Sequence, residues 1–151
     1  MTNFSLSVST LILGMLTTAG HGKELHFTEP VRQLNIESRR LALGDRDGRC
    51  ALEVHGSNGN GKGRGAPIAT GIPWPCAFHT DSKGSVRTFR RKAYTYALME
   101  SSRAENPKDC ETHVQSVRIS STKVQISPHH DRLASCPPFQ WDNILFTELF
   151  N

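Results

Sequence analysis

The sequence predicts a mainly β protein, with α+β as the alternative class: a single antiparallel-sheet domain over residues 23–151, with a short C-terminal helix and two disulfides. Three observations predict this fold. Several short stretches alternate apolar and polar residues, four cysteines occur without a C-x-x-C pair, and apolar residues at helical spacing appear near the C-terminus. With 151 residues, 36% hydrophobic and 21% charged, the chain is too apolar for a disordered tail and too polar for a multispan membrane protein.

Residues 1–22 are predicted to be a secretory signal peptide. They contain no charged side chain, and the apolar run at residues 10–16 precedes small and polar residues that suit cleavage after Ala19 or Gly20, or after Gly22. A buried N-terminal helix is the alternative. The run is shorter than the about 20 residues that a transmembrane helix needs, and no later stretch of the sequence is long and apolar enough to span a bilayer. No membrane span is therefore expected after cleavage. We therefore expect export, to the periplasm in a bacterium and otherwise into the medium.

The first part of the domain is predicted to hold short strands. They are expected at residues 25–27 and 40–43, and residues 44–48 have the composition of a turn. In the strand that follows, alternation places three side chains on the inward face: Cys50, Leu52 and Val54.

A glycine-rich loop is predicted over residues 56–75. It contains six glycines between Gly56 and Gly71 and two Asn-Gly steps, which favour turns and flexible backbone. Trp74 closes this loop between two prolines and has two interpretations. It either packs over the edge of the core, as large aromatics commonly do, or serves as a rigid contact residue.

A strand at residues 76–80 and a turn at 81–84 are expected next. Residues 86–101 form the longest predicted strand, which has apolar or small side chains on both faces and so suits the middle of a sheet. A helix over residues 90–103 is the alternative, because this stretch is rich in good helix formers.

The last part of the chain is predicted to contain a hairpin and the helix. The strand at residues 112–120 is expected to carry a bulge near 115–116, because Val114 is out of phase with the apolar residues that follow it. A return strand is expected at 124–126, followed by a loop at 128–131. An amphipathic helix should then cover a sheet face or edge, through Trp141, Ile144, Leu145 and Leu149.

The four cysteines predict two disulfides, because an even number in an exported chain usually forms a disulfide framework. Three pairings are possible. The preferred one is Cys50–Cys76 with Cys110–Cys136, since the glycine-rich segment between the first two would gain most from closure.

A metal site is the competing interpretation of the same cysteines. Cys110 and His113, together with His129 or His130 and Cys136, would supply two thiolates and two imidazoles for a tetrahedral ion. The spacing of the second half does not match an ordinary zinc finger. We therefore expect no metal and no other cofactor.

No complete catalytic motif occurs in the sequence. Gly56 to Lys62 matches the first part of a phosphate-binding loop, but neither the hydroxyl residue nor the following helix is present. A hydrolase acting on nucleic acid or another polyanion would need His55 and His79 to meet, with Lys83 or Arg87 as the cation. This secreted hydrolase is the alternative function.

The favoured function is that of a small exported binding protein, such as an inhibitor or an immunity or self-resistance factor against a toxin or antibiotic. Its candidate contact residues are Trp74, Lys62, Arg64 and Arg90. The formal net charge of +4 suits an anionic protein or small-molecule ligand, whereas nucleic acid is not expected. Charges that merely protect an edge strand from aggregation are the alternative interpretation of Arg90 and its basic neighbours. A structural extracellular module is the third possible role.

Overall fold

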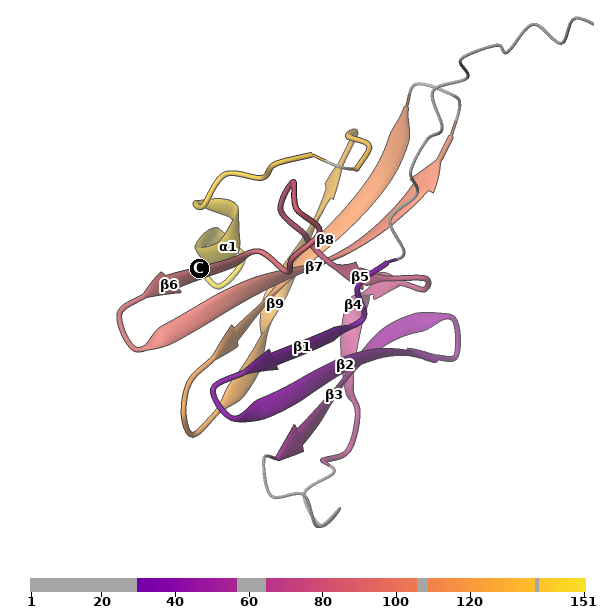
Figure 1. The fold of residues 1–151 in the computed structure, drawn as a ribbon. Helices are drawn as coiled ribbons and strands as arrows, with labels where there is room; N and C mark the ends of the chain where they lie inside the picture. The colour runs from indigo at the N-terminus through magenta and orange to yellow at the C-terminus, as the bar shows by residue number, and fades with distance from the viewer. Residues whose placement is uncertain (1–29, 57–64, 106–108, 138) are drawn as a thin grey trace, which may run out of the picture.

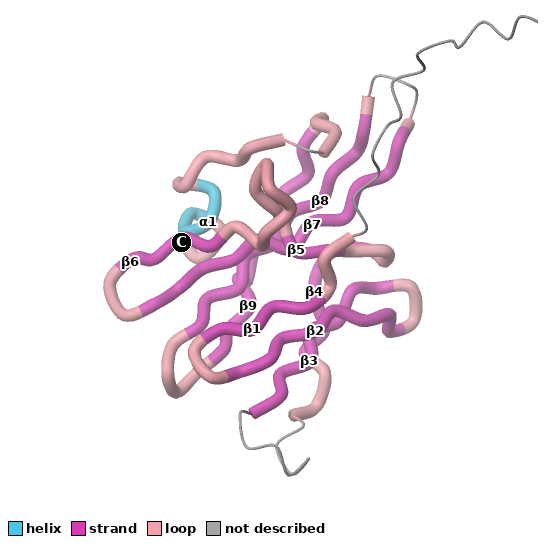
Figure 2. Tube along the Cα trace, in the orientation of Figure 1, coloured by secondary structure: helices cyan, strands magenta, loops and turns pink. Residues whose placement is uncertain are grey.

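The computed structural model describes residues 30–56, 65–105, 109–137 and 139–151. In these ranges the chain forms two antiparallel sheets that pack face to face, with one short helix on the outside (Figures 1 and 2). The prediction of a mainly β fold with antiparallel sheets is confirmed, but the strands form two sheets rather than one. The predicted signal peptide and the predicted strand at 25–27 lie outside the described residues.

The first sheet contains four strands in sequence order, β1 Gln33–Ile36, β2 Arg39–Arg46, β3 Arg49–Gly56 and β4 Ile68–Pro73. The turn between β2 and β3 is tighter than predicted and occupies only Asp47 and Gly48. Both have positive φ, of 55° and 75°, which is the backbone conformation that a two-residue hairpin turn requires.

The second sheet contains five strands, β5 Ala77–Phe78, β6 Thr88–Arg91, β7 Tyr94–Ala104, β8 Cys110–Ile119 and β9 Val124–Leu133. Its order is β5-β7-β8-β9, and β6 also pairs with β7. The strand β7 is therefore interior to the sheet, as the apolar residues on both of its faces indicated.

The main core lies between the two sheets. Alternate residues of β2 and β3 point inward and meet alternate residues of β7 and β8, so both sheets bury one face against the other. Of the three inward positions predicted for β3, Cys50 and Leu52 belong to this core, and Val54 is partly buried against it. Its members from the first sheet and the loop after it are Leu34, Leu41, Leu43, Cys50, Leu52, Ile72 and Cys76, and those from the second sheet are Phe78, Ala97, Met99, Val117 and Ile119.

A second apolar cluster lies on the outer face of the second sheet, under the C-terminal segment. The helix α1 (Leu145–Glu148) places Phe146, which is fully buried, against β7 and β8. The helix is much shorter than the spacing predicted. Trp141 is buried before it begins, and Ile144 is 55% exposed, so only part of the predicted apolar stripe faces the protein.

The prediction of a loop over residues 56–75 is wrong for residues 68–73, because these form β4. Ile68 and Ile72 point toward the core, and the hydroxyl of Thr70 between them donates to the Cys50 carbonyl at 2.6 Å. Long-range pairing with β3 thus orders a segment whose local composition favours a loop.

Two further segments differ from the predictions. Residues 86–101 form the hairpin β6–β7 rather than one strand, because Lys92 adopts a positive φ of 54° and reverses the chain. The helix predicted as the alternative there is absent. Residues 128–131 belong to β9 and pair with β8, although Pro128 and two histidines suggested a loop. The predicted bulge in β8 is confirmed between Gln115 and Val117.

The two disulfides have the predicted pairing. Cys50–Cys76 connects β3 with the start of β5 and so ties the two sheets together, while Cys110–Cys136 connects the start of β8 with the segment after β9. Their Cα–Cα distances are 6.0 and 4.9 Å. Disulfides of this kind indicate an oxidising, extracytoplasmic compartment.

Candidate binding face

The outer face of the first sheet carries a row of small and polar side chains. Because directly paired residues of antiparallel strands share a face, the strand register identifies the members of this face. None of the described helices or strands packs on it, since α1 covers the second sheet. Its residues are Gln33, Asn35, Arg40, Ala42, Gly44, Arg46, Arg49, Ala51, Glu53, His55 and Ala69.

Three arginines give this surface its charge, and we call it the arginine face. Arg40, Arg46 and Arg49 are exposed, and none of them forms an ion pair within the described part of the chain. Arg46 reaches over β3, where its guanidinium donates to the carbonyl of Pro67 at 3.4 Å. The one carboxylate of the face, Glu53, lies 3.3 Å from the imidazole of His55.

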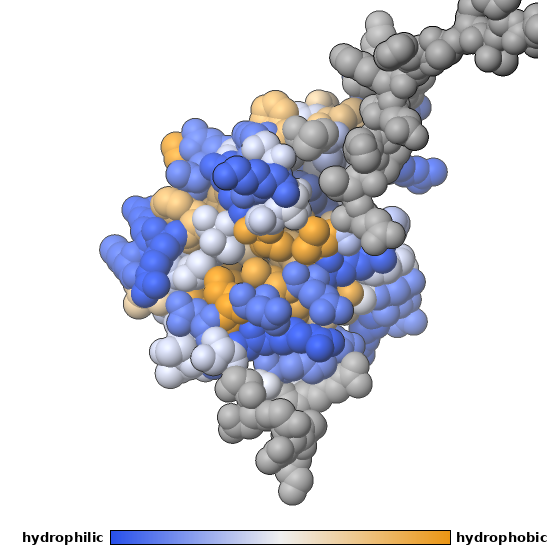
Figure 3. Space-filling view, in the orientation of Figure 1, coloured by the Kyte–Doolittle hydropathy of each residue, from blue (hydrophilic) through white to orange (hydrophobic). Residues whose placement is uncertain are grey.

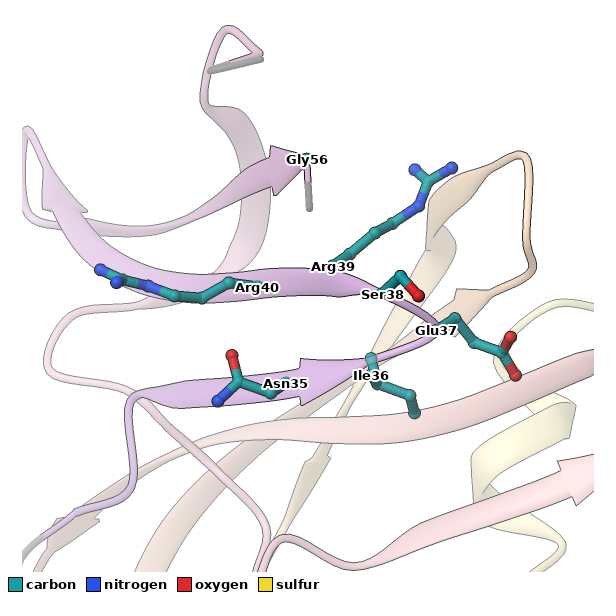
Figure 4. A pocket seen from close by; sticks show the side chains of 7 residues that line it. All are labelled: Asn35, Ile36, Glu37, Ser38, Arg39, Arg40 and Gly56. Carbon is teal, nitrogen blue, oxygen red and sulfur yellow. The ribbon is translucent and has the colours of Figure 1, made fainter. Parts of the chain in front are cut away.

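A shallow, open hollow continues the arginine face at the β1–β2 hairpin (Figure 4). Asn35 and Arg40, which pair across the two strands, form part of its lining. Arg39 points away from them, toward the β8–β9 hairpin, and donates to the carbonyl of Ser121 at 2.8 Å. The hollow is lined by Asn35, Ile36, Glu37, Ser38, Arg39, Arg40 and Gly56.

The surface colours agree with this arrangement. In Figure 3, hydrophilic residues cover the first sheet and its β2–β3 hairpin, whereas hydrophobic residues show where the two sheets face each other. The turn of that hairpin is fixed by Asp45, whose carboxylate accepts from the Gly48 N–H at 2.9 Å. That carboxylate is therefore engaged locally.

Trp74, a predicted contact residue, packs against the edge of the main core. It is half-buried, and the guanidinium of Arg32 lies 4.9 Å from the centre of its ring. Packing over the core edge was one of its two predicted interpretations. A role in contacting a partner stays a prediction.

The basic residues predicted as contacts do not gather at Trp74. Arg90 lies on β6 of the second sheet and is 75% exposed, with its guanidinium 4.0 Å from the carboxylate of Glu37. Lys62 and Arg64 lie outside the described residues. Their contact roles stay predictions.

The two histidines of the hydrolase alternative belong to different sheets. His55 is on β3, whereas His79 follows β5 and is only 2% exposed. The Nδ1 of His79 is 3.2 Å from Glu100, and the same carboxylate oxygen accepts from the indole N–H of Trp141 at 3.0 Å. Sequence analysis gave no signal for Glu100 as the neighbour of His79, because 21 residues separate them.

The C-terminal segment seals this histidine from solvent. The rings of Trp141 and Phe146 lie 6.4 and 6.5 Å from that of His79, and Arg87 donates to the Trp141 carbonyl and, at 2.8 Å, to Asn143. The Nε2 of His79 has no hydrogen-bond partner among the described residues. A polymeric substrate therefore has no path to it in this conformation.

The alternative metal site is excluded by the second disulfide. Cys110 and Cys136 are bonded to each other, and His113 lies 2.9 Å from Glu111. Over the described ranges, no cluster of three or more histidine, cysteine or acidic residues has an arrangement that would hold a metal ion. No helix in those ranges is long and apolar enough to cross a bilayer.

Comparisons with family models, curated proteins and solved structures find no match to this chain. The functional argument therefore depends on the geometry of its own residues.

Sequence analysis named none of the three arginines of this face as a contact residue, and placed only Arg40 in a strand. Residues 44–48 were predicted to form a turn, so Arg46 was not assigned to the strand that contains Arg40, although both belong to β2. Continuing the strand to residue 46 would have placed both on one face. Arg49 was overlooked because the next strand was predicted to start at Cys50.

Proposed function

We propose that this chain is an exported binding protein that holds an anionic partner on its arginine face. The observation that carries the proposal is the set of three exposed arginines, Arg40, Arg46 and Arg49, on one side of a rigid sheet without ion-pair partners in the described ranges. The planar guanidinium group binds carboxylate, phosphate and sulfate groups through paired hydrogen bonds. The proposal requires no cofactor.

The disulfides and the predicted signal peptide support a periplasmic or secreted location for this activity. Proteins of this class include inhibitors, immunity or self-resistance factors against toxins and antibiotics, and accessory proteins of the cell envelope. These roles differ in the partner that is bound rather than in the scaffold that binds it.

The proposal is tested by capture with three forms of the mature protein as bait. The first is the natural sequence, and the second removes the charges of the arginine face with Arg40→Gln, Arg46→Gln and Arg49→Gln. The third is a charge-matched control that removes exposed cations elsewhere, with Lys92→Gln, Arg103→Gln and Lys123→Gln.

We expect anionic material from the native compartment to be retained by the first and third baits and lost by the second. Retained material is identified by mass spectrometry and by carbohydrate and phosphate analysis. Equal retention by all three baits would contradict the proposal. Loss with the second and third baits alike would also contradict it, because the effect would then follow net charge rather than the arginine face.

A hydrolase acting on a polyanion is the second candidate, because His79 lies beside the Glu100 carboxylate. Its burial under the C-terminal segment opposes this function. The discriminating measurement is hydrolysis of a homopolymeric RNA by the natural protein and by the His79→Gln and His55→Gln variants. Activity that vanishes in either variant without a lower melting temperature would favour the enzyme over the binding protein.

A further inference from the structure

The arginine face is an extended track rather than a point site. Arg46 and Arg49 are directly paired on β2 and β3, and Arg40 lies six residues along β2 on the same face. At about 3.3 Å per residue, roughly 20 Å separate the two ends of the track. Groups at such a separation cannot hold a single small anion together, so the arrangement favours a ligand with several negative charges along its length.

The directly paired Arg46 and Arg49 concentrate positive charge at one end of the track. Like charges directly opposite each other in an antiparallel pair destabilise the sheet, and neither Arg46 nor Arg49 forms an ion pair within the described ranges. A carboxylate or sulfate bound between the two guanidinium groups would remove this repulsion. The end of the track at the β2–β3 hairpin is therefore the stronger anion position.

We propose that the occupant of the arginine face is a linear acidic polysaccharide, a polymer of uronate or sulfated sugars, that lies along β2. This inference rests on the function proposed above and names the chemical class of its partner. The arginines bind the acidic groups, while the side-chain amides of Gln33 and Asn35 on the neighbouring strand are donors and acceptors for sugar hydroxyls.

The size of the face opposes a folded protein as the partner. With four strands about 4.8 Å apart and a track of roughly 20 Å, the flat area is on the order of 300 Å². A stable protein interface buries about 800 Å² on each partner. A single polymer chain, in contrast, covers only a strip of this width.

The chemistry of the face opposes nucleic acid and acidic peptides. Single-stranded nucleic acids are usually held by aromatic side chains on which the bases stack, and the arginine face contains no phenylalanine, tyrosine or tryptophan. Its one ring is the imidazole of His55, which lies 3.3 Å from the carboxylate of Glu53. An extended peptide normally adds to the edge of a sheet through backbone hydrogen bonds. The backbone groups of β2 are already bonded to β1 and β3.

The centre of the face allows a sugar chain to approach the backbone closely. Between Arg40 and the Arg46–Arg49 pair, the positions on β2 are small, namely Ala42 and Gly44. On β3 the buried Ala51 pairs with Gly44, and Glu53, whose carboxylate lies 3.3 Å from the imidazole of His55, pairs with Ala42. The Arg40 end then opens into the hollow beside Asn35. A polymer that lies along β2 would thus contact an arginine at each end of the track and small side chains between them.

The test measures binding of three defined polyanions to the mature protein by isothermal titration calorimetry at low salt. The probes are polygalacturonate, polyglutamate and a 20-nucleotide oligothymidylate. The variants are Arg40→Gln and Arg49→Gln, singly and together, with Arg103→Gln on the second sheet as the control that loses the same charge. Far-ultraviolet circular dichroism confirms that each variant is folded.

We expect polygalacturonate to bind most tightly. Each of the two single variants should weaken it about fivefold, the double variant at least tenfold, and Arg103→Gln less than twofold, with all affinities falling as salt is raised. Tighter binding of oligothymidylate or polyglutamate that still depends on Arg40 and Arg49 would overturn the polysaccharide and leave the proposed function standing. If no probe binds, or if Arg103→Gln is as harmful as the other variants, both proposals fail.

Discussion

Arg46 and Arg49 form a pair of like charges that lowers the stability of the folded protein. They face each other across β2 and β3, where like charges raise the free energy of the folded state. The contribution of this pair to stability therefore does not account for its position, which is consistent with the ligand-binding role proposed above.

We predict that Arg49→Gln leaves stability unchanged or raises it by up to about 0.5 kcal/mol, because it removes this repulsion. Urea unfolding at low salt measures the change, and the gain should shrink at high salt as charges are screened. A loss of more than about 1 kcal/mol would show that Arg49 makes a stabilising contact of the kind that an ordinary structural residue makes.

Glu100 is the shared hydrogen-bonding partner of two buried side chains beneath the C-terminal segment, Trp141 and His79. Its carboxylate receives the indole N–H of Trp141 and lies 3.2 Å from the Nδ1 of His79. We predict that Glu100→Ala lowers the free energy of unfolding by about 2–3 kcal/mol, because it leaves buried polar groups without an acceptor.

Glu100→Gln should cost less than Glu100→Ala, since the amide keeps one carbonyl oxygen as an acceptor. Glu37 provides the matched control, because its side chain is 31% exposed and its one ion pair within the described ranges, with Arg90, is 4.0 Å long. Glu37→Ala is expected to change stability by less than about 0.5 kcal/mol. Equal losses for Glu37→Ala and Glu100→Ala in urea unfolding would refute this account.

The C-terminal segment, as an element, is held by its buried side chains rather than by helix propensity. A four-residue helix is too short to be stable alone, so its position depends on packing against β7 and β8 and on the bond from the Ser116 hydroxyl to the Phe146 carbonyl at 2.7 Å. Arg87 secures the residues before the helix.

We predict that Phe146→Ala destabilises the protein by about 3–5 kcal/mol, because its ring is fully buried in the second apolar cluster. The neighbouring Ile144→Ala should change stability by less than about 0.5 kcal/mol, since Ile144 is 55% exposed. Thermal unfolding and binding of a hydrophobic dye measure both effects. Similar melting temperatures for the two variants would mean that the segment does not cover the sheet as described.

The two disulfides are expected to differ in reactivity, although each closes a loop of the same length. Cys50 and Cys76 are 0% and 3% exposed, whereas Cys110 and Cys136 are half-buried. In the chain-entropy account each contributes about 3.5 kcal/mol to stability.

Under mild reduction without denaturant, we predict that Cys110–Cys136 opens first, because reducing thiolates reach it more readily. Alkylation followed by peptide mass spectrometry identifies which cysteines have been released. Earlier release of Cys50 and Cys76 would show that burial does not control the order.

For the molecule as a whole, the prediction concerns its processing and compartment. Protein purified from the producing cell should have a mass that corresponds to cleavage after Ala19, Gly20 or Gly22, with no thiol that reacts with an alkylating agent before reduction. Intact-mass analysis measures both properties at once. An uncleaved amino terminus with four reactive thiols would remove the basis for export and for the proposed function together.

Local patterns were sufficient for much of this fold. Side-chain alternation predicted β3 and the two faces of β7, and the phase change at Val114 predicted the bulge in β8. The gain from closing the glycine-rich segment favoured the disulfide pairing that is observed. Each of these features depends on residues close in sequence or on loop closure, which the order of residues contains directly.

Other features depend on contacts between residues that are distant in the sequence. β4 forms because β3 offers it backbone partners, Glu100 meets His79 because β5 pairs with β7, and Arg46 joins Arg49 because the turn takes only two residues. No local pattern contains these pairings, since strand register and sheet packing are set by the burial of the whole core. The sequence by itself thus determined the mainly β class and the pairing of the cysteines, whereas the arginine face arose only when two strands were aligned side by side.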